Sequence, residues 1–276
     1  MTPQETNKDY PSPQDERQQK KKGRLPYIAL GLSFLLIIGG AIGYGVYLQS
    51  IKEPSTVVEF KPQGSPEAVS HPQEAERVEN PIDFEALRAI NADVHAWITV
   101  PGTTVDYPIC QHPTDDSVYL DHDIELNHYP PGTLFTERVN NRSFTDPVTL
   151  IYGHVGYTDI MFATLHNYSS REFFDTHEHF VIYTPEHILT YQVISAYVYD
   201  DRHIINTNGS FLQEETLAEY FEFVTSPDSI SSNVREGVSL TATDRVVQLS
   251  TCMQNLLLTN NRYIVTGLLI NEQLTY

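Results

Sequence analysis

Cysteine and basic residues are both scarce in this sequence of 276 residues. Its only two cysteines, Cys110 and Cys252, are too few for the disulfide framework of a small secreted domain. Neither has a partner at zinc-ligand spacing, so we expect no metal site and no cofactor. Seventeen Lys and Arg against 36 Asp and Glu give a net charge of −19. Nucleic acid is therefore not expected as a partner, because phosphate contact needs a basic surface.

Long apolar runs are scarce too, and only residues 25–48 form an uncharged stretch of 24 residues. As a helix this stretch would be roughly 36 Å long, enough to cross a hydrocarbon core of about 30 Å. It is too long for a cleaved signal, and no small-x-small cleavage site follows it. We therefore expect a transmembrane signal-anchor helix, with a buried core helix as the alternative. Basic residues at 20–24 precede it, so the positive-inside rule places the N-terminus in the cytoplasm and the rest outside the cell membrane.

Composition divides the chain into four segments. Residues 1–24 are polar and are expected to be a disordered cytoplasmic tail, followed by the anchor at 25–48. Residues 49–79 contain scattered Pro and charge and are expected to be an extracellular linker. Residues 80–276 are long enough for one domain with a large core. Asn80 and Pro81 suit the N-cap and first position of a helix, whose predicted apolar side runs from Ile82 to Val94 and Trp97.

From residue 96 on, the hydrophobic pattern is that of β-strands. Eight short apolar stretches are separated by turn residues, which favours a mainly β barrel or sandwich. The expected strands cover residues 96–100, 105–110, 132–136, 148–154, 180–183, 188–199, 245–252 and 263–270. Helical breaks are expected at 160–168 and 171–177, and a longer helix at 213–224, between the sixth and seventh strands.

The seventh expected strand ends in Cys252, and Arg262 follows ten residues later, at the start of the eighth strand. Two adjacent strands joined by a short loop are most simply antiparallel, which would bring the thiol and the guanidinium to one end of the pair. A fixed positive charge favours a neighbouring thiolate and can also stabilise an oxyanion. Alone, the pair is also compatible with a buried cysteine beside a surface charge.

Among the 11 histidines, His154 differs because an apolar strand leads up to it and a turn is expected directly after it. It follows the apolar residues 149–152 and Gly153, which places an imidazole at the end of a buried strand, where it can reach a cleft. His177 and His179 have the pattern of a solvated surface, with metal binding as the alternative.

The chain resembles the class B sortases, membrane-anchored cysteine transpeptidases of Gram-positive bacteria, from about residue 80 to residue 269. The matching motifs are Trp-Ile-Thr-Val-Pro-Gly at 97–102, Tyr-Leu-Asp-His-Asp at 119–123, Gly-Thr-Leu-Phe at 132–135, Ile-Tyr-Gly-His at 151–154, Met-Phe-Ala-Thr-Leu at 161–165, Leu-Ser-Thr-Cys at 249–252, and Arg262. The family fold is an eight-stranded β-barrel with N-terminal helices, and class B members carry a helix between strands six and seven.

This resemblance implies a role for each candidate residue. Cys252 would be the nucleophile, His154 the general acid and base, and Arg262 the cation that holds substrate and oxyanion. The enzyme would cleave a C-terminal sorting signal after threonine and transfer the acyl group to an amine of a peptidoglycan precursor or a pilin subunit. Hydrolysis by water would be a side activity. Residues expected to bind the substrate are Leu249, Ser250, Thr251 and Leu257.

Class B members are associated with Asn-Pro-Gln-Thr-Asn-like signals, and other sortases with Leu-Pro-x-Thr-Gly-like signals. Residues 253–258, Met-Gln-Asn-Leu-Leu-Leu, depart from the acidic, polar and aromatic residues that family members often carry there. No carboxylate lies between Cys252 and Arg262, so this loop offers none to the mechanism. The leucines either form an apolar wall of the substrate groove or pack on the neighbouring helix.

The residues argue against a second class of cysteine peptidase and leave one non-enzymatic function open. Papain-like cysteine peptidases place Cys before His, whereas here His154 comes first, and a caspase-like sequence around Cys252 is absent. A non-catalytic surface binding module could keep the same barrel without a reactive thiol.

Overall fold

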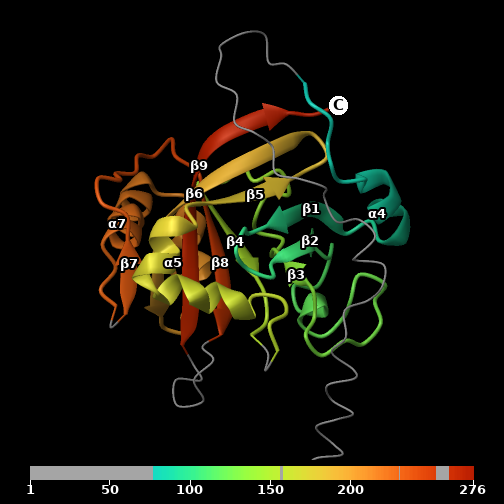
Figure 1. Cartoon of the computed structure of the whole chain (residues 1–276), viewed down its shortest axis with the longest axis horizontal. Helices are drawn as coiled ribbons and strands as arrows, with labels where there is room; N and C mark the ends of the chain where they lie inside the picture. Colours follow the sequence, from blue (N-terminus) through green and yellow to red (C-terminus); the bar gives the residue numbers. More distant parts are fainter. Residues whose placement is uncertain (1–76, 156–157, 230, 253–260) are drawn as a thin grey trace, which may run out of the picture. The chain divides into compact units, whose positions relative to one another are not determined.

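The computed structural model describes residues 77–155, 158–229, 231–252 and 261–276. Within these residues one sheet has the strand order β5-β1-β2-β3-β4-β8-β9-β6-β7, and a further pairing of β5 with β6 closes eight strands into a barrel (Figure 1). β7 pairs with the second half of β6. The strands are β1 (Val94–Thr99), β2 (Asp106–Cys110), β3 (Leu134–Phe135), β4 (Val148–Tyr152), β5 (His179–Tyr183), β6 (His187–Tyr199), β7 (Ser232–Val234), β8 (Val246–Cys252) and β9 (Arg262–Leu274).

The eight-stranded barrel predicted from the sequence is confirmed. Each expected strand overlaps one strand of the barrel. The additional strand β7 was not predicted, because its three residues are exposed or half-buried and show no apolar alternation.

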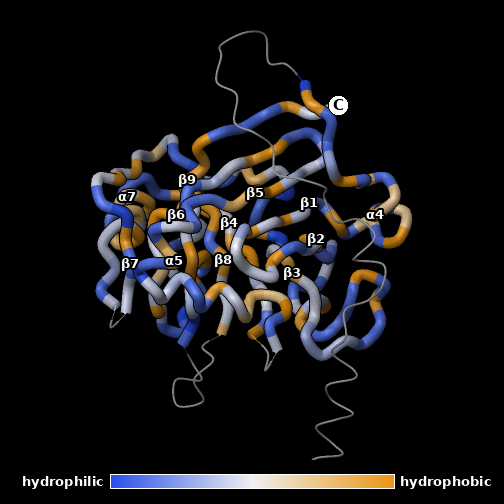
Figure 2. Tube along the Cα trace, in the orientation of Figure 1, coloured by the Kyte–Doolittle hydropathy of each residue, from blue (hydrophilic) through white to orange (hydrophobic). Residues whose placement is uncertain are grey.

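The alternation of side chains along the strands separates two hydrophobic clusters. Val247 and Leu249 of β8 belong to the larger cluster, which fills the barrel. Val246 instead belongs to a second cluster, where Leu217 and Phe221 of α7 (Glu214–Thr225) cover the outside of the sheet. Figure 2 shows hydrophobic and hydrophilic positions alternating along the strands. The face of β8 that carries its even-numbered residues is therefore the outer face of the barrel.

The helical elements include the predicted one between strands six and seven of the barrel. α7 lies between β6 and β8 and closely matches the expected residues 213–224. The helical breaks expected near residues 160–168 and 171–177 are also present. The remaining described helices are η1 (Val118–Leu120), η2 (Ala163–Ser169), α5 (Arg171–Thr176), α6 (Ile204–Thr207) and η3 (Gly209–Phe211).

The helix that precedes the barrel begins later than predicted. α4 spans Phe84–Ile90, and the Asp83 side chain caps it by accepting a hydrogen bond of 2.9 Å from the first turn. Asn80, predicted as the N-cap, instead donates 2.7 Å to a backbone carbonyl beside the β5–β6 turn. Val94 and Trp97, predicted on the apolar side of this helix, belong to β1.

Among the described residues, no helix is both long and apolar enough to cross a membrane. The apolar run at 25–48, the tail before it and most of the linker lie outside these residues. Both cysteines are free, and Cys110 is buried, which raises the pKa of its thiol. The described part of the chain contains no group of three or more His, Cys, Asp or Glu that could hold a metal ion.

Candidate active site

β8 and β9 place a thiol and a guanidinium opposite each other. Arg262 is the direct partner of Cys252 in the antiparallel pairing, as the sequence predicted. Directly opposed residues project from the same face of a sheet, with Cβ atoms about 5 Å apart. Both residues are half-buried, and Arg262 forms no ion pair with any described residue. The guanidinium and the thiol therefore belong to the same face at one end of the β8–β9 pair.

A parallel pairing brings His154 to the same end of the sheet. β4 runs parallel to β8, with Tyr152 opposite Ser250. The Gly153 N–H then donates to the Ser250 carbonyl at 3.1 Å. β4 ends at Tyr152, so His154 follows two residues after its last paired position, near the end of β8 that carries Cys252. The three residues thus lie at or just beyond the ends of three neighbouring strands.

The glycine before His154 is required by close packing. A Cβ at Gly153 would lie 2.5 Å from Leu134 Cδ2 and 2.6 Å from Phe162 Cδ2. Without that Cβ, Phe162 packs against the backbone, and its N–H donates to the His154 carbonyl at 3.1 Å. The Gly-His pair is therefore set by the contact between the end of β4 and the segment that leads into η2.

The His154 imidazole is directed at the backbone of η1. Its Nε2 lies 2.7 Å from the Leu120 carbonyl oxygen, and because a carbonyl only accepts, Nε2 carries the hydrogen. Among the described residues, no hydrogen bond joins His154 to Cys252. The Nε2–H is thus engaged by the Leu120 carbonyl in this structure.

The four residues predicted to bind substrate fall into three groups. Leu249 is fully buried in the barrel cluster, and Thr251, two residues further, is also buried. Ser250 is buried too, but it lies on the same face of β8 as Cys252, because side chains alternate along a strand. Leu257 lies outside the described residues, with the rest of the loop at 253–260.

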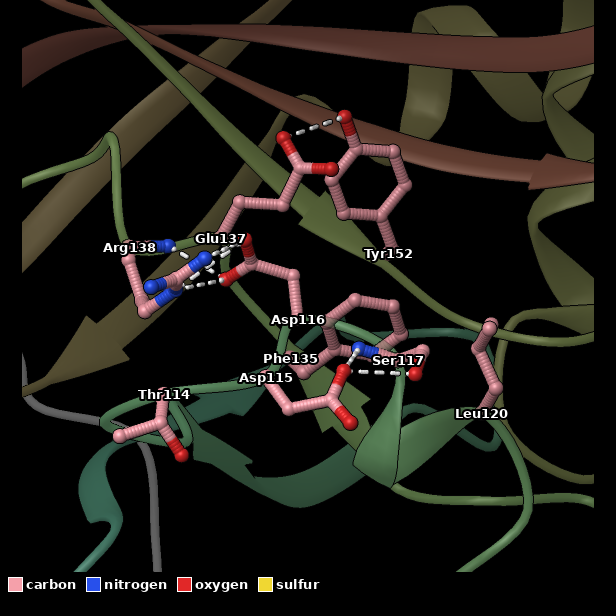
Figure 3. A pocket seen from close by; sticks show the side chains of 9 residues that line it. All are labelled: Thr114, Asp115, Asp116, Ser117, Leu120, Phe135, Glu137, Arg138 and Tyr152. Carbon is pink, nitrogen blue, oxygen red and sulfur yellow. Dashed lines mark hydrogen bonds and ion pairs between the residues drawn. The ribbon is translucent and has the colours of Figure 1, made fainter.

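A cavity of about 480 Å³ borders the site (Figure 3). Its apolar wall includes Leu120 and Tyr152, and Tyr152 donates from its hydroxyl to Glu137 at 3.5 Å. On the opposite wall Arg138 binds Asp116 at 3.2 Å. Burial and then Glu137 raise the pKa of Tyr152, whereas Arg262 acts on it in the opposite direction. Leu120, which lines the cavity, accepts the hydrogen bond from His154, and Tyr152 of the same wall pairs with Ser250 of β8, so the cavity adjoins the site.

One further histidine near Cys252 has no local pattern that would predict it. Nε2 of His166, in η2, lies 3.1 Å from the carbonyl oxygen of Cys252. Its ring stacks on Tyr263 with the ring centroids 4.8 Å apart.

Comparisons with known proteins agree with this fold. The family model of the sortase domain matches residues 98–270, so the chain belongs to the sortase family, whose members are cysteine transpeptidases that anchor proteins to the cell wall. Sortase B of Listeria monocytogenes is 29% identical over 193 residues, covering 69% of this chain and 75% of that protein.

Two solved structures resemble the chain over the same part. The Staphylococcus aureus sortase B–substrate complex has a TM-score of 0.59 and 28% identity, covering 68% of this chain and 84% of that one. A Streptococcus pyogenes class B sortase involved in pilus biogenesis has a TM-score of 0.59 and 31% identity, covering 68% and 97%. Within the family, the chain is a class B sortase.

Proposed function

We propose that Cys252 is the nucleophile of a two-step acyl transfer, with His154 as general acid and base and Arg262 as the cation. The observation that carries this assignment is the direct cross-strand pairing of Cys252 with Arg262. A free thiol is mostly protonated at neutral pH, and a cation on the same face of the sheet favours the reactive thiolate. The parallel pairing of β4 with β8, whose last pair is Tyr152 with Ser250, supports a position of His154 near Cys252.

In the first step, the Cys252 sulfur attacks the carbonyl carbon of the threonine in a C-terminal sorting signal. The C–S bond forms, the C–N bond to the next residue breaks, and His154 gives a proton to the leaving amine. Arg262 stabilises the oxyanion, because it is always charged and its planar fork can donate two hydrogen bonds.

In the second step, an amine attacks the thioester and gives a proton to His154, and the C–S bond breaks to restore the thiolate. The amine comes from a peptidoglycan precursor or a pilin subunit, and competing water produces hydrolysis as a side activity. Among the predicted substrate contacts, we assign Ser250 and Leu257 to the groove. Leu249 and Thr251 support the strand from its buried face.

We further propose that residues 25–48 anchor the chain in the cell membrane by a single pass, with residues 1–24 in the cytoplasm and residues 80–276 outside. This proposal is supported by the length of the uncharged run and the basic residues before it. If substrate and acceptor are tethered to the same membrane, anchoring raises their effective concentration at the site.

The test is trapping of the acyl enzyme. The purified full-length chain is mixed with quenched peptides carrying Asn-Pro-Gln-Thr-Asn-like or Leu-Pro-x-Thr-Gly-like signals, with and without an added amine. Intact mass should show a thioacyl adduct on Cys252 with one preferred signal, and the amine should speed turnover. Cys252→Ala should abolish the adduct, and His154→Ala should leave a folded but nearly inactive chain. Normal acylation by His154→Ala, or no adduct from a folded wild-type chain with any peptide, would refute the assignment.

A further inference from the structure

One helical segment contacts the backbones of both residues proposed to react. The Phe162 N–H, directly before η2, donates to the His154 carbonyl at 3.1 Å. His166, within η2, lies 3.1 Å from the Cys252 carbonyl oxygen. β4 ends at Tyr152, two residues before His154, and β8 ends at Cys252 itself. Each of the two contacts is therefore made at the end of a strand.

The chemistry of the His166 contact is that of a single hydrogen-bond donor. Burial lowers the pKa of His166, which leaves the imidazole neutral at neutral pH with one N–H. Since the Cys252 carbonyl can only accept, that hydrogen is on Nε2. Stacking on Tyr263, which pairs with Thr251 and is adjacent to Arg262, fixes the plane of the ring.

η2 is itself held at both ends, so the donor stands on a rigid support. Near its start, the Thr164 hydroxyl oxygen accepts from the Thr104 N–H at 3.1 Å. Near its end, Asn233 Nδ2 of β7 donates to the Tyr168 carbonyl at 2.8 Å. Leu165 and Tyr168 are fully buried, and η2 contacts β6, β7 and β9 before the chain continues into α5 (Figure 1).

We infer that His166 is a positioning residue for the Cys252 nucleophile. Its Nε2–H holds the Cys252 carbonyl, which fixes the peptide plane at the end of β8 and the direction of the thiol toward Arg262. Without the donor, the peptide plane can rotate and the thiol spends less time in the attacking geometry. This inference rests on the proposed role of Cys252. Because His166 contacts backbone rather than substrate, its loss should lower kcat and leave KM unchanged.

Two substitutions separate the donor from the packing. His166→Phe keeps an aromatic ring on Tyr263 and removes the N–H, whereas His166→Gln keeps a side-chain N–H at similar reach and removes the ring. We expect kcat for acylation to fall about three- to tenfold in His166→Phe, the scale of one neutral hydrogen bond, and to remain near wild type in His166→Gln. His177→Gln is the matched control. His177 and His166 both line a second cavity, separate from the one in Figure 3, but His177 bonds to the Phe173 carbonyl and not to Cys252. Wild-type kcat in His166→Phe, or an equal fall in His166→Gln, would overturn the inference.

A second measurement needs no sorting signal, so it separates a failure of this inference from a failure of the proposed function. Cysteine labelled with ¹³C at the carbonyl gives two NMR signals, from Cys252 and Cys110. The Cys110 carbonyl accepts from the Thr136 N–H at 3.0 Å and serves as the internal control. His166→Phe should shift only the Cys252 signal and slow alkylation of Cys252 by iodoacetamide several-fold, and His166→Gln should restore both. An unchanged Cys252 signal and an unchanged alkylation rate in His166→Phe would refute the inference, whether or not the wild-type chain forms an acyl enzyme.

Discussion

Lowering the pH toward 4 should remove folding stability through one buried histidine, His95 in β1, which is 1% exposed. Its Nδ1 donates to the Arg142 carbonyl at 2.9 Å. Its Nε2, 3.1 Å from the Thr136 hydroxyl, accepts from that group. Gln111 supports this direction of the hydrogen bond between Thr136 and His95. Its amide donates to the Thr136 oxygen, which leaves the hydroxyl hydrogen free to be donated to His95. Burial lowers the pKa of His95 from 6.5 to about 4, against a smaller opposite effect of the Arg142 carbonyl.

The sign and size of the change in folding stability follow from the difference between the pKa of His95 in the unfolded and in the folded chain. In the unfolded chain His95 takes up its proton near pH 6.5, and in the folded chain only near pH 4. Between these values the unfolded state binds more protons, so stability falls as the pH falls. At about 1.4 kcal/mol per pH unit, the loss is about 3 kcal/mol once the pH reaches the folded-state value. Above pH 6.5 the side chain is neutral in both states, and its full contribution is retained.

The assay is urea unfolding of wild type and His95→Asn at several pH values between about 7 and 4. The asparagine amide can donate to the Arg142 carbonyl in place of Nδ1 but does not titrate. His95→Asn should lose about 3 kcal/mol less than wild type over this range, whatever its stability at pH 7. His166, whose pKa burial also lowers, titrates in both chains and cancels in the difference. Equal losses in the two chains would show that His95 does not titrate in this way.

Three further predictions concern the site and the barrel. Arg262→Lys keeps the positive charge but loses the planar guanidinium that can donate two hydrogen bonds. We expect kcat/KM to fall roughly 10²-fold, the scale for the loss of one oxyanion donor. A near-wild-type rate in the peptide assay would contradict the proposed role of Arg262. Leu257→Asp should lower kcat/KM without changing thermal stability if the leucines line the groove, and a lower Tm instead would show that they pack on a helix. Gly267→Ala should lower the free energy of unfolding by about 1–3 kcal/mol, because its Cβ would lie 2.4 Å from Phe180 Cε1. An unchanged urea midpoint would show that Phe180 yields without cost.

The barrel could be predicted from the sequence because each of its strands carries buried residues in short runs between turns. The errors lie where two periodicities overlap. Val94 and Trp97 continue the helical spacing that starts at Phe84, yet both are fully buried in β1. The helix ends at Ile90, and the chain turns into the sheet within a few residues. Pairing of Val94 with Cys110 decides this, and it is a contact that no local pattern contains.

Part of the candidate site could also be predicted from the sequence. Cys252 and Arg262 lie at facing ends of two consecutive strands, so the simplest pairing was sufficient to bring them together. The two-residue period of a strand also predicts that Ser250, and neither Leu249 nor Thr251, shares the face of Cys252. His166 could not be found, because its contact with Cys252 spans 86 residues of sequence and depends on how η2 docks.

The parallel register of β4 with β8 has a consequence for folding. The two strands are almost a hundred residues apart along the chain, and a parallel pair cannot form from a local hairpin. Contacts of such high sequence separation are expected to form late, after shorter loops have closed. Cys252 and Arg262 can meet within a single hairpin, whereas His154 joins them only when this long loop closes. Under the proposed roles, a partly folded chain would carry a thiol beside a cation but no proton donor for the leaving amine, and acyl transfer would begin only in the completed barrel.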